Sequence, residues 1–237
     1  MAFACIVTGM SGALSRDVLG VGIEAVVFDL DGTLIDSETG WFRTFQAVTA
    51  AYERDWTSAE HIKNMSAPRD EWLERVEAKL GLGWSFERYK DMVRKVRNVV
   101  DPKHPYLFPG AREAVAWAAE RYPVAIASSG SRNGVLRNIE RMGIGQYLTV
   151  VVGGDEVQNS KPAPDIYLET AARLGVAVEH CLALEDSVNG IRAASSAGAR
   201  VIAVCNPHFP VPEVEMRSCV AVIDRVGELP MLLSDVS

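Results

Sequence analysis

The chain has 237 residues, 48% of them hydrophobic and 23% charged, and its formal net charge at neutral pH is −7. This length suits one large domain or two small ones, with enough apolar residues to form a core. The acidic balance argues against nucleic-acid binding, which usually needs a basic face, and no apolar run is long enough to span a membrane.

Cysteine usage indicates the compartment. The four cysteines, Cys5, Cys181, Cys205 and Cys219, form no Cys-x-x-Cys pair, and the four histidines are scattered. We therefore expect a reducing compartment, a cytoplasmic protein, and neither a disulfide framework nor a zinc site. Residues 1–22 are mostly small and apolar but lack the positively charged N-terminal region of a signal peptide. This favours a poorly ordered extension over a targeting segment.

The first half of the chain predicts one strand followed by helices. The apolar run Ala25–Phe28 is short and reads as a buried strand within a segment 23–37. Over residues 38–105 the apolar residues then recur at the spacing of a helix. Helices are predicted on the apolar stripe Trp41–Tyr52, over Arg69–Leu80 and from Phe86 to Val100, and Thr57 and Glu60 have the spacing of a capping box.

Residues 106–237 alternate between strand and helix, after a proline-rich linker that begins at Asp101. Strands are predicted at Val124–Ala127, Leu148–Val152, Cys181–Leu184, Val201–Cys205 and Val220–Ile223. Helices are predicted at Ala111–Arg121, Arg132–Met142, Ala163–Leu174 and Val188–Ala197, with Gly143 and Gly175 as C-caps. This alternation predicts an α/β fold, a Rossmann-like parallel sheet with helices on both faces, into which the all-helical segment 38–105 is inserted after the first strand.

Polar residues gather where four of these strands end. They are Asp29, Asp31, Gly32 and Thr33, then Ser128 and Ser129, then Lys161, and finally Glu185 and Asp186. Ligands of open α/β sheets bind at this edge, so these side chains are expected to meet there. In a strictly extended strand, positions 29 and 31 would point to the same side.

The chemistry of this set is that of a phosphate site. Asp29, Glu185 and Asp186 form an oxygen-rich anionic cluster that suits Mg²⁺. Ser128 and Lys161 can bind phosphate oxygens. One carboxylate can attack phosphorus, and a second one nearby can protonate the leaving oxygen.

In this pattern the chain resembles the haloacid dehalogenase superfamily, in its phosphotransferase branch with an inserted helical cap, similar to β-phosphoglucomutase and sugar phosphatases. The segment DLDGT matches the first motif of that family, and Ser128 matches the second. Lys161 within SKPAPD matches the third, and LEDSVNG matches the fourth. The match runs from about Glu24 onward, and residues 38–105 stand where the family inserts its cap.

The resemblance implies a role for each matching residue. Asp29 is expected to be the nucleophile and Asp31 the general acid and base. Mg²⁺ is expected on Asp29, the Asp31 backbone carbonyl, Asp186, and Glu185 as a ligand or the partner of one. The phosphoryl group is expected on Ser128 and Lys161, and Ser129 beside them is expected to bind phosphate as well.

Other residues have weaker support. Arg69, in the helical insertion, can meet an anionic substrate, and Asn133 can touch substrate or simply cap a helix. Asp36 and Glu38 are expected to shape the hinge or lie exposed, and the Trp41–Tyr52 stripe is expected to form the core of the insertion.

Three functions stay open. The favoured one is a Mg²⁺-dependent phosphatase that acts on a small sugar or polyol phosphate, as a monomer or weak dimer. A phosphomutase is the alternative, but the mutase relatives carry a histidine where this chain has Trp41. The presence of Asp31 argues against dehalogenase and phosphonate chemistry, and a binding module without turnover is the remote alternative.

Overall fold

The computed structural model describes residues 22–65, 69–100, 106–206 and 209–234. Apart from Gly22, the predicted N-terminal extension lies outside these ranges. The chain divides into two compact units, called here the sheet unit, up to Ile35 and from Leu107 on, and the helical unit, Asp36–Tyr106. Within the described residues, no helix has the length and hydropathy needed to cross a bilayer.

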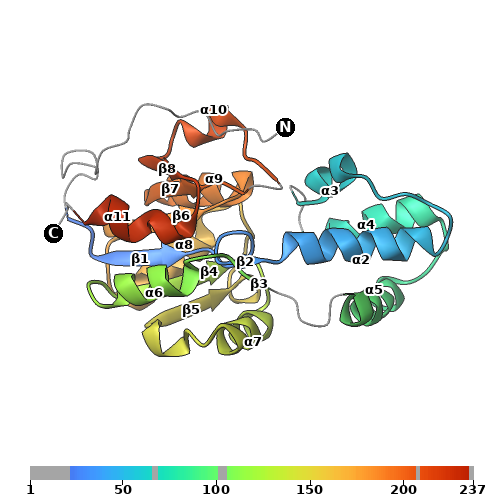
Figure 1. Cartoon of the computed structure of the whole chain (residues 1–237), viewed down its shortest axis with the longest axis horizontal. Helices are drawn as coiled ribbons and strands as arrows, with labels where there is room; N and C mark the ends of the chain where they lie inside the picture. The colour runs from blue at the N-terminus through green and yellow to red at the C-terminus, as the bar shows by residue number, and fades with distance from the viewer. Residues whose placement is uncertain (1–21, 66–68, 101–105, 207–208, 235–237) are drawn as a thin grey trace. The chain divides into compact units, whose positions relative to one another are not determined.

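The sheet unit is built on one parallel sheet (Figure 1). Its strands, in spatial order, are β5 (Val150–Gly153), β4 (Val124–Ser128), β1 (Ala25–Phe28), β6 (Cys181–Glu185), β7 (Arg200–Val204) and β8 (Ala221–Ile223). Every neighbouring pair runs parallel. Each predicted strand is present, with ends that differ from the prediction by at most two residues.

Side chains alternate along the central strand and define two cores. Val26 and Phe28 pack into the core under α6 (Ala111–Ala119), α7 (Arg132–Met142) and α11 (Leu229–Leu233). Ala25 and Val27 pack into the opposite core, under α8 (Asp165–Leu174) and α9 (Val188–Ala197). Because both faces of β1 are covered, its run is apolar throughout, as in other parallel sheets. The predicted fold class is confirmed.

The ends of the helices show where sequence signals held. Gly143 and Gly175 adopt the left-handed conformation that ends α7 and α8, as predicted. Helix α8 begins at Asp165, two residues later than predicted, directly after Pro164. The short helix α10 (Glu213–Met216) and α11 were not predicted, because runs of four or five residues carry too little periodicity.

The helical unit contains α2 (Glu38–Ala50), α3 (Ser58–Met65), α4 (Arg69–Leu80) and α5 (Phe86–Val100). Its core is formed by Phe45, Val48, Trp56, Val76, Tyr89 and Val93. The capping box is confirmed, since the Thr57 amide donates to Glu60 Oε2 at 2.8 Å and the Glu60 amide donates to Thr57 Oγ1 at 3.3 Å. Two short strands, β2 (Ile35–Asp36) and β3 (Tyr106–Leu107), pair where the chain passes between the units.

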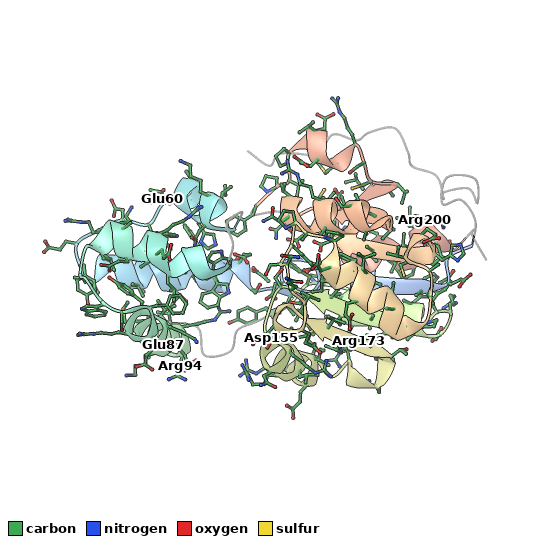
Figure 2. All side chains as sticks on the ribbon, turned by 180° about the vertical axis from the view of Figure 1, so that it is seen from behind. Glu60, Glu87, Arg94, Asp155, Arg173 and Arg200 are labelled. Atoms are coloured by element: carbon green, nitrogen blue, oxygen red, sulfur yellow. The ribbon has the colours of Figure 1, made fainter. Side chains whose placement is uncertain are left out.

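Glu38 is expected from the sequence to shape the hinge or lie exposed, and the expectation of exposure is wrong. Glu38 is buried, and its Oε2 lies 3.3 Å from Nε2 of the equally buried His61. Charged side chains of both signs project elsewhere from the surface, among them Glu87 and Arg94 of the helical unit (Figure 2). The partner of Glu38 lies on α3, a helix for which the sequence showed only the capping box.

Tyr89 offers a test of this core. Its side chain is buried, and its hydroxyl has no hydrogen-bond partner among the described residues. We expect Tyr89→Phe to raise the free energy of unfolding by about 1 kcal/mol, since a desolvated and unpaired hydroxyl is removed while the ring stays. Urea unfolding of both proteins measures the difference. A less stable variant would show that the hydroxyl has a partner in solution.

Candidate active site

The first two aspartates follow the central strand. Strand β1 ends at Phe28, and the Asp29 amide still donates to the Leu184 carbonyl of β6 at 3.0 Å, which fixes Asp29 at the sheet edge. The extended pairing stops there, so strand alternation does not place Asp31. Its position is set by a turn through Gly32, and its Oδ2 accepts a hydrogen bond from the Ser128 hydroxyl at 3.1 Å.

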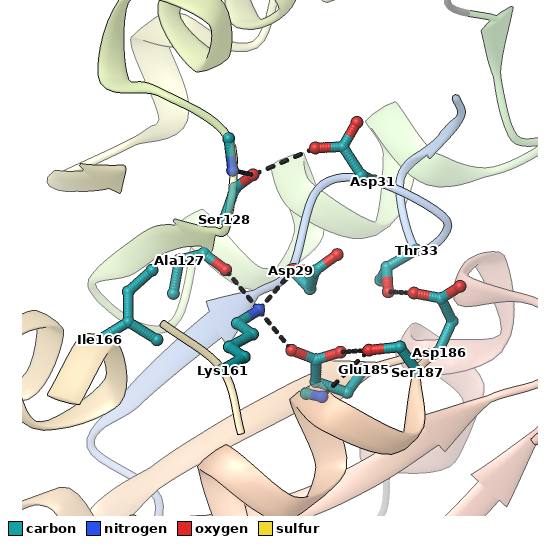
Figure 3. Close-up of polar contacts among 12 residues, drawn as sticks. Asp29, Asp31, Thr33, Ala127, Ser128, Lys161, Ile166, Glu185, Asp186 and Ser187 are labelled. Atoms are coloured by element: carbon teal, nitrogen blue, oxygen red, sulfur yellow. Dashed lines mark hydrogen bonds and ion pairs between the residues drawn. The ribbon is translucent and has the colours of Figure 1, made fainter. Parts of the chain in front are cut away.

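Lys161 is the centre of the buried polar contacts (Figure 3). Its ammonium donates to Asp29 Oδ1 at 2.6 Å, to Glu185 Oε1 at 2.6 Å and to the Ala127 carbonyl at 2.9 Å. An ammonium group has three protons, so these three acceptors use its full donor capacity. Burial disfavours the charge of Lys161, but Asp29 and Glu185 outweigh that effect and raise its pKa, which keeps the group charged.

Three buried carboxylates lie close together, and two of them, Asp29 and Glu185, contact this lysine. Asp29, Glu185 and Asp186 each offer an oxygen, and these oxygens lie within 4.8 Å of one another. Burial raises the pKa of Asp29 well above its ordinary value; Lys161 opposes this, and the charges of Glu185 and Asp186 add to it. When all are ionised, three negative charges face one positive charge, an imbalance that a bound cation would relieve.

Asp186 is held by neutral donors. The Thr33 hydroxyl donates to its Oδ1 at 3.0 Å, and the Asn206 side-chain amide donates to its Oδ2 at 3.1 Å. Asn206, which follows β7, was not predicted as part of the site. The available signal was its position, because β7 lies beside β6 and their carboxyl ends share an edge.

Two glycines let backbone approach these carboxylates. A Cβ atom on Gly32 would lie 2.0 Å from Asp186 Oδ2, and one on Gly190 would lie 1.8 Å from Glu185 Oε2. Gly32 also has a φ of +96°, a conformation that side chains disfavour. The chain therefore requires glycine at both positions to close the site around Asp186 and Glu185.

The loop after β4 carries the predicted serines. Buried Ser128 accepts a hydrogen bond from the Gly130 amide at 3.0 Å, which orients its hydroxyl toward Asp31. Ser129 is exposed, and Asn133 is exposed in the first turn of α7. Arg69 begins α4, and its side chain lies outside the described residues. The structure thus brings together Asp29, Asp31, Ser128, Lys161, Glu185 and Asp186, whereas Ser129 is exposed.

The donor set fits a hard divalent cation. All three side chains are carboxylates at a strand edge, with no sulfur or imidazole among the clustered groups. Mg²⁺ prefers such oxygen ligands and is usually bound by one or two carboxylates together with substrate phosphate.

Comparison with known proteins gives the family. The model of the haloacid dehalogenase-like hydrolase family matches residues 26–204. The phosphorylated carbohydrates phosphatase of Thermotoga maritima is 35% identical over 177 residues, 74% of this chain and 82% of that protein. Hexitol phosphatase B of Escherichia coli K12 is 32% identical over 203 residues, 81% of this chain and 86% of that protein.

A solved structure agrees with these matches. CbbY from Rhodobacter sphaeroides, in complex with phosphate, superposes with a TM-score of 0.73 at 27% identity, over 87% of this chain and 96% of that one. The chain belongs to the haloacid dehalogenase-like hydrolases, an enzyme family whose matched members include sugar phosphatases. The family assignment made from the four motifs is confirmed.

Proposed function

We propose that this protein is a Mg²⁺-dependent phosphatase that hydrolyses a small sugar or polyol phosphate through a phosphoaspartyl intermediate on Asp29. The observation that carries the proposal is the buried Asp29 at the end of β1, bound to Lys161 at 2.6 Å and clustered with Glu185 and Asp186. The names of the carbohydrate and hexitol phosphatases support the substrate class.

The reaction has two halves. In the first, a carboxylate oxygen of Asp29 attacks phosphorus in line, the ester P–O bond breaks, and Asp31 protonates the departing alkoxide. In the second, Asp31 takes a proton from water, whose oxygen attacks phosphorus, so that phosphate leaves and Asp29 is restored. The hydrogen bond from Ser128 holds Asp31 in one orientation for both transfers.

The ammonium group of Lys161 stabilises the negative charge of the phosphoryl group. When Asp29 becomes an acyl phosphate it loses its charge, and the hydrogen bond of Lys161 shifts from Asp29 toward a phosphoryl oxygen. A Mg²⁺ ion held by Asp29, Asp186, Glu185 and the Asp31 carbonyl would supply further positive charge for these oxygens. Catalysis then rests on positioning and electrostatic stabilisation.

We propose that the helical unit serves as the cap that selects the leaving group. Its Trp41 takes the position at which mutase relatives carry a histidine. The Trp41 ring stacks on Phe45 with centroids 5.9 Å apart, meets Trp72 edge-on, and lies 3.7 Å from the Arg97 guanidinium. Trp41 is therefore used for packing, and it cannot replace the histidine of the mutase relatives. The lack of that histidine favours water over a sugar hydroxyl as the phosphoryl acceptor.

The deciding experiment measures phosphate release from a panel of sugar, polyol and short-acid phosphates, including β-glucose 1-phosphate, with Mg²⁺ and with EDTA. Product sugars are followed in parallel. Free phosphate from a few esters supports the phosphatase. Isomerised sugar phosphate with little free phosphate would identify a mutase, and binding without turnover would identify a non-catalytic module.

Asp31 is expected to act in both halves. Asp31→Asn should slow phosphorylation and dephosphorylation of Asp29 by roughly 10²–10⁴-fold each, the usual contribution of a general acid or base. Rapid-quench single turnovers measure the two rates separately. p-Nitrophenyl phosphate is the internal control, because its phenolate leaves without protonation, so only its dephosphorylation step should slow. Unchanged rates with an alkyl phosphate would refute the role.

A further inference from the structure

Tyr167 places a hydroxyl group among the charged residues of the site, although no step of the proposed reaction uses it. The side chain comes from α8 and is 1% exposed. Its hydroxyl donates to Glu185 Oε1 at 2.5 Å, and its ring centroid lies 5.2 Å from Lys161 Nζ. A tyrosine hydroxyl is protonated at neutral pH, so it acts here as a donor.

Glu185 Oε1 is the acceptor that Tyr167 and Lys161 share. The carboxylate is fully buried, and its other oxygen receives a longer bond from the Ser187 hydroxyl, at 3.3 Å. If Lys161 weakens its contact, water cannot replace it at this depth. A buried charged acceptor that loses a donor pays a large desolvation cost unless a second donor remains.

Lys161 must loosen some contact to bind substrate. Its three protons are engaged by Asp29, Glu185 and the Ala127 carbonyl. A new bond to a phosphoryl oxygen therefore draws on one of these three. The Tyr167 hydroxyl keeps Glu185 hydrogen-bonded and fixed while the ammonium group moves.

We propose that Tyr167 is a positioning residue that holds Glu185 in place and so allows Lys161 to turn from Asp29 to the phosphoryl group in the transition state. This inference rests on the proposed phosphatase function. Without the hydroxyl, Glu185 Oε1 would rely on Lys161 as its donor and would hold the ammonium group more tightly. The effect belongs to the transition state, so the chemical step should suffer more than substrate binding.

The test is Tyr167→Phe, with Tyr89→Phe as the matched control, because both remove one buried hydroxyl and keep the ring. Full-length proteins are assayed with saturating Mg²⁺ and p-nitrophenyl phosphate, and orthovanadate serves as the mimic of the transferring phosphoryl group. We expect Tyr167→Phe to lower kcat and weaken orthovanadate inhibition, each about tenfold, the effect of one hydrogen bond to a charged group. KM should change less than about twofold, and Tyr89→Phe should leave all three values unchanged.

A double-mutant cycle separates positioning from packing. If Tyr167 acts through Glu185, Tyr167→Phe should add little to the loss already caused by Glu185→Gln. Additive losses would overturn the proposal, as would a lower melting temperature with unchanged kcat and orthovanadate inhibition. A wild-type protein without turnover would refute the phosphatase function instead, and calorimetric titration with orthovanadate would still test Tyr167.

Discussion

Replacement of Asp29 with asparagine is expected to abolish phosphate release, with kcat reduced roughly 10⁴-fold or more, as when other covalent nucleophiles are removed. An amide oxygen cannot form the phosphoaspartyl bond. It can still accept the hydrogen bond that Lys161 now gives to Asp29 Oδ1. The site should keep its geometry while the reaction is lost. Phosphate release from the best ester of the panel measures the effect.

Two controls make this result specific to the nucleophile. Circular dichroism and thermal unfolding should show a folded variant, because burial already disfavours a charge at Asp29 and the amide carries none. Asp224→Asn, the same change at an exposed position of the sheet unit, should leave the activity unchanged. Substantial turnover by Asp29→Asn, with no phosphorylated enzyme in acid-quenched wild type, would mean that water attacks the ester directly.

The sheet unit could be predicted because its signals are local. The run Ala25–Phe28 lies between Glu24 and Asp29, and it is buried on both faces as a central parallel strand must be. Gly143 and Gly175 end their helices in the left-handed conformation, which few other residues adopt easily. Strand and helix lengths then leave little freedom, and the parallel topology follows from their alternation.

The parts that were missed depend on contacts between distant segments. Strands β2 and β3 are two residues each and form only because Ile35–Asp36 meets Tyr106–Leu107. The burial of Glu38 depends on His61, which stands on a helix of eight residues. No periodicity within such short segments could indicate either pairing.

The candidate site likewise has a part that the sequence predicts and a part that depends on contacts between distant segments. Its charged residues follow strand ends, so topology alone brings Asp29, Lys161 and Glu185 to one edge. Tyr167 and Asn206 were not predicted, since each reads as an ordinary residue in its own segment. Their hydroxyl and amide reach Glu185 and Asp186 through the packing of α8 and the neighbouring position of β7. The roles of all these residues remain proposals that the variants test.

Removal of divalent cations should abolish turnover, and Mg²⁺ should stabilise the fold. The reason is the excess of negative charge among Asp29, Glu185 and Asp186, which Lys161 alone does not balance. A ligand that binds only the folded state, at a concentration 100 times its Kd, raises the free energy of unfolding by about 2.7 kcal/mol. For a chain of this length that is a rise of roughly 5–10 °C in melting temperature. EDTA should reverse both effects, and added Mg²⁺ should restore them.

Asp186→Asn provides the test that does not depend on activity. The variant keeps an oxygen that Thr33 can donate to, loses the oxygen that accepts from the Asn206 amide, and removes one buried charge from the cluster. Its melting temperature without Mg²⁺ should stay close to that of the wild type, because the weaker repulsion among the carboxylates offsets the lost hydrogen bond from Asn206. The rise in its melting temperature on addition of Mg²⁺ should disappear, whereas Asp224→Asn should show the same rise as the wild type. If wild type and Asp186→Asn respond equally to Mg²⁺, the ion binds elsewhere, and the excess charge must be relieved by a protonated Asp29.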